Sequence, residues 1–352
     1  MKGLVTRMTR QTKGALLLAL AGSLWGFNGL YVRVLSDAGL GPLSIVFVRY
    51  ACALAMLVPA ASAASARAGR DILALDPRCL ACCVGLGLVS NALGGVFSAL
   101  AIERVGVSTT TVLLYTAPAL GCLMSWRLFG EQLTRQKVAA IACNFAGVLL
   151  VVASGGALLG AMSTAGLMAG LGYGLTYALT AVLSRPIAGA CHPLSVVYYG
   201  SLTVAAAMAI PAVGSGELVG VLQPGPAIAA LLYGGLSTVA ANLLYQQGMS
   251  SGIETSKVAV ITSVEVAVSA FVGTLAFGES PAALKVLGIC GVLSSILLMN
   301  LHVAPEEVHG VRLVLTTEQL HAVYGVQADL DQAVKDVRRK REDALGLKYR
   351  ER

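Results

Sequence analysis

Apolar residues fill ten long stretches of the chain, and polar residues are largely confined to the short breaks between them. A helix that crosses a membrane needs about 20 mostly apolar residues, which matches these stretches. Pro, Gly and Asp punctuate the breaks, as is typical of turns between helices. The pattern predicts ten membrane-spanning helices joined by short loops, the longest at residues 61–78. The helices are expected at residues 14–33, 41–60, 79–100, 106–129, 136–154, 163–184, 193–213, 226–248, 256–277 and 282–302.

The composition is typical of a membrane protein. Of the 352 residues, 56% are hydrophobic and 12% are charged, and the mean hydropathy is +0.77. A soluble domain, in contrast, carries about 25% charged residues. The N-terminal stretch is basic and then apolar but has no convincing cleavage site, so we expect residues 14–33 to be an uncleaved span. The chain is therefore expected to be an all-α, multi-pass protein in contact with membrane lipid.

The net charge of +7 is distributed as a membrane topology predicts. If the N terminus lies in the cytoplasm, 21 of the 25 Lys and Arg residues fall on the cytoplasmic side. Cytoplasmic loops of membrane proteins carry such an excess of Lys and Arg. We therefore expect both termini in the cytoplasm, a location in the cell (plasma or inner) membrane, and no nucleic-acid partner. Residues 1–13 and 303–352 are expected to be cytoplasmic tails.

Two segments of the chain repeat each other. Residues 129–141 read FGEQLTRQKVAAI and residues 277–289 read FGESPAALKVLGI, an offset of 148. We predict a first repeat at residues 14–154 and a second repeat at residues 163–302, with five helices each. Because five is odd, the second repeat must enter the membrane from the opposite side. Inverted repeats of this kind are typical of carriers, whose substrate sites lie near the middle of the membrane between the repeats.

Several short motifs occur in order along the predicted helices: Gly22-Ser-Leu-Trp25-Gly26, Pro42 with Arg49, Thr116-Ala-Pro118 with Gly130-Glu131, and Glu265 with Gly278-Glu279. Together they resemble the EamA family of the drug/metabolite transporter superfamily, over roughly residues 14–302. The resemblance implies a central cavity lined mainly by the first, third, fourth, sixth, eighth and ninth helices. It also implies proton- or exchange-coupled movement of small metabolites, often outward.

Two charged residues inside predicted helices are candidates for function. Glu265 lies well within the ninth, where an ionised carboxylate costs roughly 2.5 kcal/mol or more. It is expected either to carry a coupling proton or bind a substrate amine, or to be protonated and bonded to a neighbouring helix. Arg49 in the second helix is expected either to bind a substrate carboxylate, or to extend towards the membrane interface or pair with a helix end.

Polar and aromatic side chains within the apolar stretches are further candidates for substrate contacts. Amides buried in lipid need hydrogen-bond partners, which a neighbouring helix or a wet cavity supplies. Tyr and Trp suit amphipathic solutes, but they also serve in packing and at the membrane interface. The candidates for substrate binding are Trp25, Asn28, Asn91, Tyr115, Tyr177, Asn242 and Tyr245.

Three other features are given structural interpretations. Glu131 and Glu279 recur in the two repeats, and each is expected to cap a helix junction just before Arg135 or Lys285. The Cys residues at 79–83 lack a second ligand pair, so neither a metal site nor a disulfide is expected. Residues 317–345 of the tail favour a helix that pairs in a homodimer, lies on anionic lipid, or remains solvated and partly disordered.

The function that these patterns favour is secondary transport. We expect an exporter of small amphipathic metabolites such as amino acids, with no cofactor. An importer of the same fold is one alternative, and a membrane sensor or scaffold that signals through the tail is another. An enzyme is disfavoured because the sequence contains no HExxH, GxSxG or P-loop motif.

Overall fold

The computed structural model describes residues 2–153, 163–277 and 283–300, and the regular elements in these ranges are all helical. The chain divides into two units, Met1–Val308 and His309–Arg352, and the described residues all belong to the first. Glu279 and the predicted tail helix therefore lie outside the described residues. Eight described stretches are long and apolar enough to cross a membrane. They are Arg10–Asp37, Pro42–Ala68, Pro77–Ile102, Thr110–Phe129, Thr164–Ile187, Pro193–Gly214, Pro224–Met249 and Thr255–Gly273.

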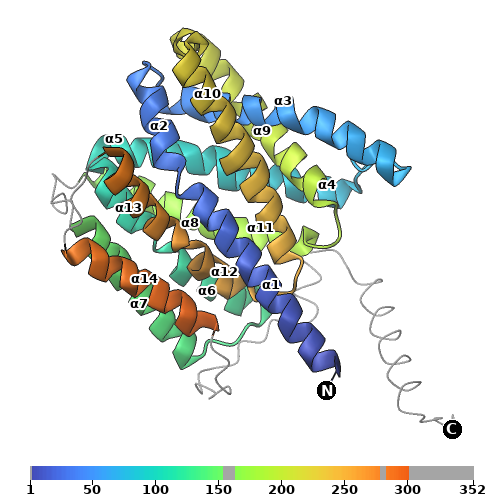
Figure 1. Ribbon diagram of the computed structural model, residues 1–352, viewed down its shortest axis with the longest axis vertical. Coiled ribbons are helices and arrows are strands. Elements are labelled where there is room, and N and C mark those ends of the chain that lie inside the picture. The colour runs from blue at the N-terminus through green and yellow to red at the C-terminus, as the bar shows by residue number, and fades with distance from the viewer. Residues whose placement is uncertain (1, 154–162, 278–282, 301–352) are drawn as a thin grey trace. The chain divides into compact units, whose positions relative to one another are not determined.

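Helices, or consecutive helices, occupy the positions predicted for the first repeat (Figure 1). Pro42 and Pro77 stand in the first turn of their helices, where a backbone N–H has no partner to lose. The elements are α1 (Lys2–Trp25), α2 (Asn28–Asp37), α3 (Pro42–Ala68), α4 (Pro77–Gly85), the π-helix η1 (Leu86–Ala92), α5 (Leu93–Leu114), α6 (Ala117–Phe129) and α7 (Arg135–Ala153).

The second helix is longer than the sequence predicted. α3 continues through residues 61–68, which were predicted to be a loop. This extension is rich in Ala, the residue with the highest helix propensity. Gly69 then ends the helix with a φ of +62°, a left-handed conformation that favours glycine.

The chain reverses direction within α5. A Cβ on Gly172 of α8 would lie 3.0 Å from the Phe97 ring, and a Cβ on Gly170 would lie 3.0 Å from Cβ of Leu113. A straight helix would separate Phe97 and Leu113 by about 24 Å, whereas Gly170 and Gly172 are two positions apart. The two ends of α5 therefore lie beside the same part of α8, as two antiparallel spans require.

Helices also occupy the positions predicted for the second repeat. Pro193 and Pro224 begin α9 and α10 in the same way as Pro42 begins α3. The elements are α8 (Thr164–Ile187), α9 (Pro193–Gly214), the 3₁₀-helix η2 (Glu217–Leu222), α10 (Pro224–Leu232), the π-helix η3 (Tyr233–Ala240), α11 (Ala241–Met249), α12 (Thr255–Thr262), α13 (Val264–Phe277) and α14 (Ala283–Asn300).

Three of the spanning stretches are interrupted. The first breaks at Gly26 and Phe27, between α1 and α2. The α5–α6 break at Tyr115 and Thr116 corresponds, at the offset of 148, to the α12–α13 break at Ser263. Interrupted helices leave backbone groups free and are common at the binding sites of carriers.

The most extensive helix contacts join the two repeats. α7 packs along α14, α5 along α8, α3 along α9 and α1 along α11. Figure 1 shows the first of these pairs side by side at the lower left. Glycine permits the closest approach, since a Cβ on Gly147 of α7 would lie 2.7 Å from the backbone N of Val292. The two repeats thus share one core between them.

Candidate functional site

A cavity of about 400 Å³ lies between the helices of both repeats. This volume is within the range of about 300–1,000 Å³ that is typical of small-molecule pockets. The family resemblance implied a wall from the fourth predicted helix, but no described residue of that helix lines the cavity. The second helix lines it instead, through residues between Pro42 and Tyr50, while α6 packs against α8 and α12.

The cavity brings together eight of the nine residues proposed from the sequence. The exception is Tyr115, which packs beside Val148, Val266 and Val292 and is not among the lining residues. The eight are Trp25, Asn28, Arg49, Asn91, Tyr177, Asn242, Tyr245 and Glu265.

Arg49 is held by hydrogen bonds to the second repeat. Its Nε donates to Thr238 Oγ1 at 2.6 Å, its Nη1 to Tyr233 Oη at 3.2 Å and its Nη2 to the Ser237 carbonyl at 3.1 Å. Its guanidinium carbon also lies 4.5 Å from the centre of the Tyr233 ring. These contacts fix the cation at the cavity wall.

The carbonyl that Arg49 contacts belongs to the π-helix η3. The Ser237 carbonyl also accepts from Trp25 Nε1 at 3.0 Å, and Ser237 Oγ donates to the Leu24 carbonyl at 2.9 Å. Short π-helical segments recur at functional sites. η1 lies at the equivalent place in the first repeat, because residues 86–92 become 234–240 when shifted by 148.

Glu265 lies in the first turn of α13, directly after the break at Ser263. Tyr177 Oη donates to Glu265 Oε2 at 3.3 Å. The Tyr177 ring lies edge-on to Trp25, with centroids 6.4 Å apart, and the Tyr245 ring centroid lies 5.5 Å from that of Trp25. The carboxylate thus lies at the edge of an aromatic cluster.

The charged residues Arg49 and Glu265 have no charged counterpart at the equivalent position of the other repeat. Arg49 follows Pro42 by seven residues, and the residue seven after Pro193 is Gly200. Glu265, shifted by 148, corresponds to Ala117. Arg49 and Glu265 are also the two charged side chains among the described residues that line the cavity. The two repeats therefore contribute different chemistry to the cavity.

Sequence reasoning did not select several lining residues. Tyr50, Ser90 and Thr180 line the cavity, and Thr238 binds Arg49. Ser90 and Thr238 belong to the π-helices, and Thr180 lies one turn after Thr176 in an apolar helix. The recurrence of Gly87-Leu-Val-Ser90 as Gly235-Leu-Ser-Thr238 at the offset of 148 is the signal that could have drawn attention to Ser90 and Thr238.

Glu131 caps a different helix from the one that was predicted. It was expected to cap α7, but it accepts from the backbone N of Thr255 at 2.7 Å and of Ser256 at 2.9 Å, in the first turn of α12. It also pairs with Arg185, whose guanidinium carbon lies 4.4 Å from the centre of the Phe129 ring. The cause is the long-range packing of α6 against α12 and α8, which local sequence does not reveal.

The pKa of Glu131 reflects these contacts. Burial alone would raise the pKa of this carboxyl, but the hydrogen bonds from Ser256 and Thr255, together with Arg185, hold it below the usual value. Glu131 is therefore ionised at neutral pH. Its partner residue in the second repeat, Glu279, lies outside the described residues.

The structure adds Cys191 to the cysteines at 79–83. Cys191 and Cys83 belong to one buried cluster, against which Cys79 and Cys82 pack. All four are free thiols, and within the described residues no group of three or more ligating side chains has the arrangement of a metal site. Burial raises the pKa of the Cys191 thiol to about 12, so the protonated, unreactive form dominates at neutral pH.

These features define a class of protein: a multi-pass helical membrane protein with a polar, solute-sized cavity between its helices. The chain belongs to the EamA-like transporter family, whose pattern matches residues 12–153 and 164–301. A solved structure described only as "Crystal structure of protein" has a TM-score of 0.68, covers 82% of this chain and 96% of its own, and is 18% identical. At that identity the likeness shows the fold alone. No curated protein sequence matches the chain.

Proposed function

We propose that this protein is a secondary carrier that exports small zwitterionic metabolites such as amino acids. Ten spanning helices, arranged as two inverted repeats of five, would alternate the cavity between the two sides of the cell membrane. Both termini would lie in the cytoplasm. The contacts between α7 and α14 and between α3 and α9 support this arrangement, because each joins equivalent helices of the two repeats.

One observation carries the proposed substrate class: the cavity holds one cation and one anion. Arg49 offers a planar group with two N–H donors beyond the three that bind Thr238, Tyr233 and the Ser237 carbonyl, which suits a carboxylate. Glu265 accepts one hydrogen bond, from Tyr177, and so has capacity for an ammonium. The tyrosines and Trp25 that line the cavity supply an apolar wall for the rest of the solute.

Coupling is proposed to act through Glu265. A carboxylate in an apolar helix is stable when it is neutralised, and either a proton or a substrate ammonium does so. Competition between these two cations for one site would exchange a proton for a substrate. Asn28 supports this assignment, because its Oδ1 is buried without a partner among the described residues and can accept from an amine.

Counterflow in proteoliposomes tests the proposal. Purified protein would be loaded with pooled amino acids and other small metabolites, with and without a pH gradient. We expect saturable exchange for the wild-type protein, and loss of gradient-driven accumulation for Glu265→Gln. Glu217→Gln is the control, because Glu217 lies outside the cavity lining.

Each result has a separate meaning. Exchange that Glu265→Gln leaves unchanged would reduce Glu265 to a structural role. Exchange restricted to amines without a carboxylate would contradict the role of Arg49. Absence of exchange for every pool would contradict the carrier and favour the sensor alternative, whereas uptake driven inward would favour the importer.

A further inference from the structure

The two ends of the cavity differ in how far the lining residues extend towards the ends of the helices. At one end the lining reaches Ser36, the second-last residue of α2, and Pro42, the first residue of α3. The cavity therefore extends to the ends of the helices on that side. At the other end the lining stops at Ala181 in α8 and Val258 in α12, short of the helix ends. We call these the open end and the closed end.

A network of polar contacts lies just beyond the closed end. Arg185 follows Ala181 by four residues and Thr255 precedes Val258 by three, which is about one helical turn in each case. Arg185 pairs with Glu131, and its Nη1 donates to Thr255 Oγ1 at 2.8 Å. Two different helices thus place the same network immediately below the cavity.

The network joins the two repeats. Glu131 belongs to the first repeat, whereas Arg185, Thr255 and Ser256 belong to the second. Glu131 is 8% exposed and receives the backbone N–H groups of Thr255 and Ser256, as an anion at a helix N-terminus does.

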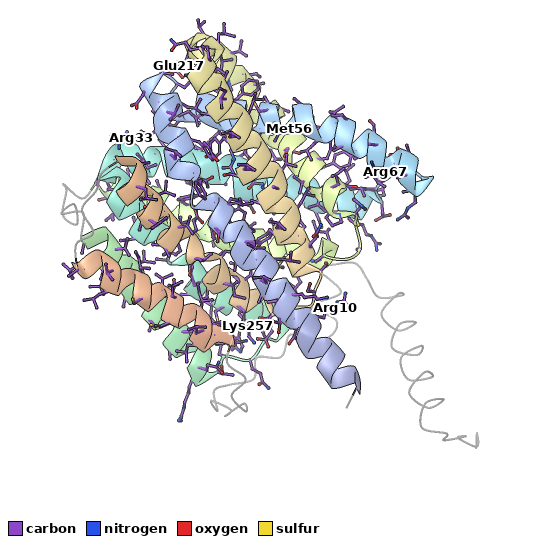
Figure 2. All side chains as sticks on the ribbon, in the orientation of Figure 1. Arg10, Arg33, Met56, Arg67, Glu217 and Lys257 are labelled. Atoms are coloured by element: carbon purple, nitrogen blue, oxygen red, sulfur yellow. The ribbon has the colours of Figure 1, made fainter. Side chains whose placement is uncertain are left out.

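A second ion pair crosses the repeats at the same place. Lys137 Nζ of the first repeat lies 2.6 Å from Glu254 Oε2 of the second. Figure 2 shows Lys257, which also approaches Glu254 at 3.7 Å, in the lower part of the view together with Arg10, and Glu217 at the top. Charged contacts between the repeats therefore hold α12 and α8 against the α6–α7 junction.

The repeated FGE motif supplies three parts of this network. The Phe129 ring packs against the Arg185 guanidinium, Gly130 takes the left-handed φ of +63° that ends α6, and Glu131 follows in position to reach α12. α12 continues through the break at Ser263 to Glu265 at the cavity wall. A displacement of α12 at the network would therefore move the segment that carries the proposed coupling residue.

We propose that Glu131 and Arg185 are positioning residues of the transport cycle, which hold the closed end shut and separate each time it opens. The inference rests on the proposed alternation of the cavity. A solute can leave by the closed end only if α8 and α12 part from the α6–α7 junction. Because Glu131 binds both helices at once, the loss of its contacts releases both together.

A thiol placed near the closed end reports which side the cavity faces. Thr180→Cys puts the thiol on the lining one turn before Ser184, and the same protein without this substitution accounts for the native thiols. A membrane-impermeant maleimide would be added to one side of sealed vesicles at a time. The side of the closed end is identified with Ala190→Cys, an exposed position in the loop after α8.

In the otherwise wild-type protein, Thr180→Cys should react from the open side. In Glu131→Gln, reaction from the closed side should rise about tenfold, as for the loss of one charge-assisted hydrogen bond, and reaction from the open side should fall. Arg185→Gln should act in the same direction, and Arg185→Lys should restore part of the wild-type ratio. If the substitutions only loosened the packing, the labelling rates from the two sides would rise together. The ratio of closed-side to open-side labelling therefore distinguishes a role in closing the cavity from a general role in packing.

Glu217→Gln is the matched control. Glu217 is a carboxylate of the second repeat that accepts from Gly41 N at 2.8 Å and Ser44 Oγ at 2.6 Å, in the first turn of α3 of the first repeat. It joins the repeats as Glu131 does, but at the open end. Its loss should leave the closed-side reaction of Thr180→Cys unchanged.

The proposal would be overturned if the ratio of closed-side to open-side labelling of Thr180→Cys stayed unchanged in both Glu131→Gln and Arg185→Gln, in protein that keeps its thermal stability. If Glu131→Gln does not fold, Arg185→Gln decides alone, because Arg185 caps no helix. The labelling needs no substrate. A changed ratio without counterflow would therefore contradict the carrier but not the positioning pair, and counterflow with an unchanged ratio would contradict the pair alone.

Discussion

The residues that recur between the repeats and those that do not have different roles. Phe129, Gly130 and Glu131 recur in sequence, and the structure places them in contacts that hold helices together. Arg49 and Glu265 do not recur, and both line the cavity. Contacts that maintain the fold of a repeat are needed in both repeats, whereas a solute with two different ends needs different groups at each end.

Arg49→Lys should impair recognition of a carboxylate. A Lys ammonium cannot reproduce the planar set of bonds to Thr238, Tyr233 and the Ser237 carbonyl. We expect the KM for an amino acid to rise about tenfold or more, the effect of one lost charge-assisted bond, and the KM for the corresponding amine to change little. Counterflow with the two solutes measures the difference. Thr238→Val, which removes one partner of the guanidinium, should raise the KM for the amino acid relative to that for the amine by a smaller factor. Equal effects on both solutes would contradict the role of Arg49 in binding the carboxylate.

The contacts that hold the closed end shut should not depend on pH near neutrality. Because the pKa of Glu131 is lowered in the folded protein, its contribution is complete above the ordinary carboxyl value of 4.5 and is lost only as the pH falls through the lower folded value. The cation that faces it is Arg185. In a Glu265→Gln background, the labelling ratio of Thr180→Cys should be constant between about pH 5 and 8. If the labelling ratio instead changed with a midpoint within that range, Glu131 would not be the group that holds the closed end shut.

The positions of the helices followed from the sequence because apolar length alone determines them, but their interruptions did not. Polar residues in apolar stretches, such as Asn91 and Glu265, marked the cavity because buried polar groups need partners. The same reasoning selected Tyr115, which packs beside Val148 and Val266, since a Tyr on an apolar face fits either environment. The contacts of Arg49 depend on η3, and no local pattern distinguishes a π-helix from an α-helix.

Gly22 should be intolerant of a side chain because α1 crosses the α12–α13 break at this point. A Cβ on Gly22 would lie 2.5 Å from the Thr262 carbonyl and 2.9 Å from Val264 Cγ1. Gly22→Ala should therefore destabilise the protein by about 1–3 kcal/mol, seen as a lower Tm in detergent. Gly29→Ala is the control, since a Cβ there meets nothing within 4 Å and should leave the Tm equal or higher. Equal losses for both variants would contradict this packing.

At the scale of the whole molecule, the closed end and the N-terminal end coincide. Arg10 Nη2 of α1 donates to the Ser250 carbonyl at 3.2 Å, in the turn that leads to Thr255. The basic residues Arg67 and Arg185 lie in the last turns of α3 and α8, and Lys257 lies in the first turn of α12, also at this end. If these cations lie in the cytoplasm, as the distribution of Lys and Arg favours, the cavity described here faces outward, ready to release or to bind a solute outside.

Two exposed positions test this orientation. Ala190 lies between α8 and α9 at the closed end, and Gln223 lies between η2 and α10 at the open end. In intact cells we expect an impermeant maleimide to label Gln223→Cys and to label Ala190→Cys only after the membrane is permeabilised. The pattern follows from the cost of moving Lys and Arg across the membrane, about 2.3 kcal/mol per charge for each 100 mV. The reverse pattern would place the open end in the cytoplasm, so that the described state would be the one that captures a solute for export.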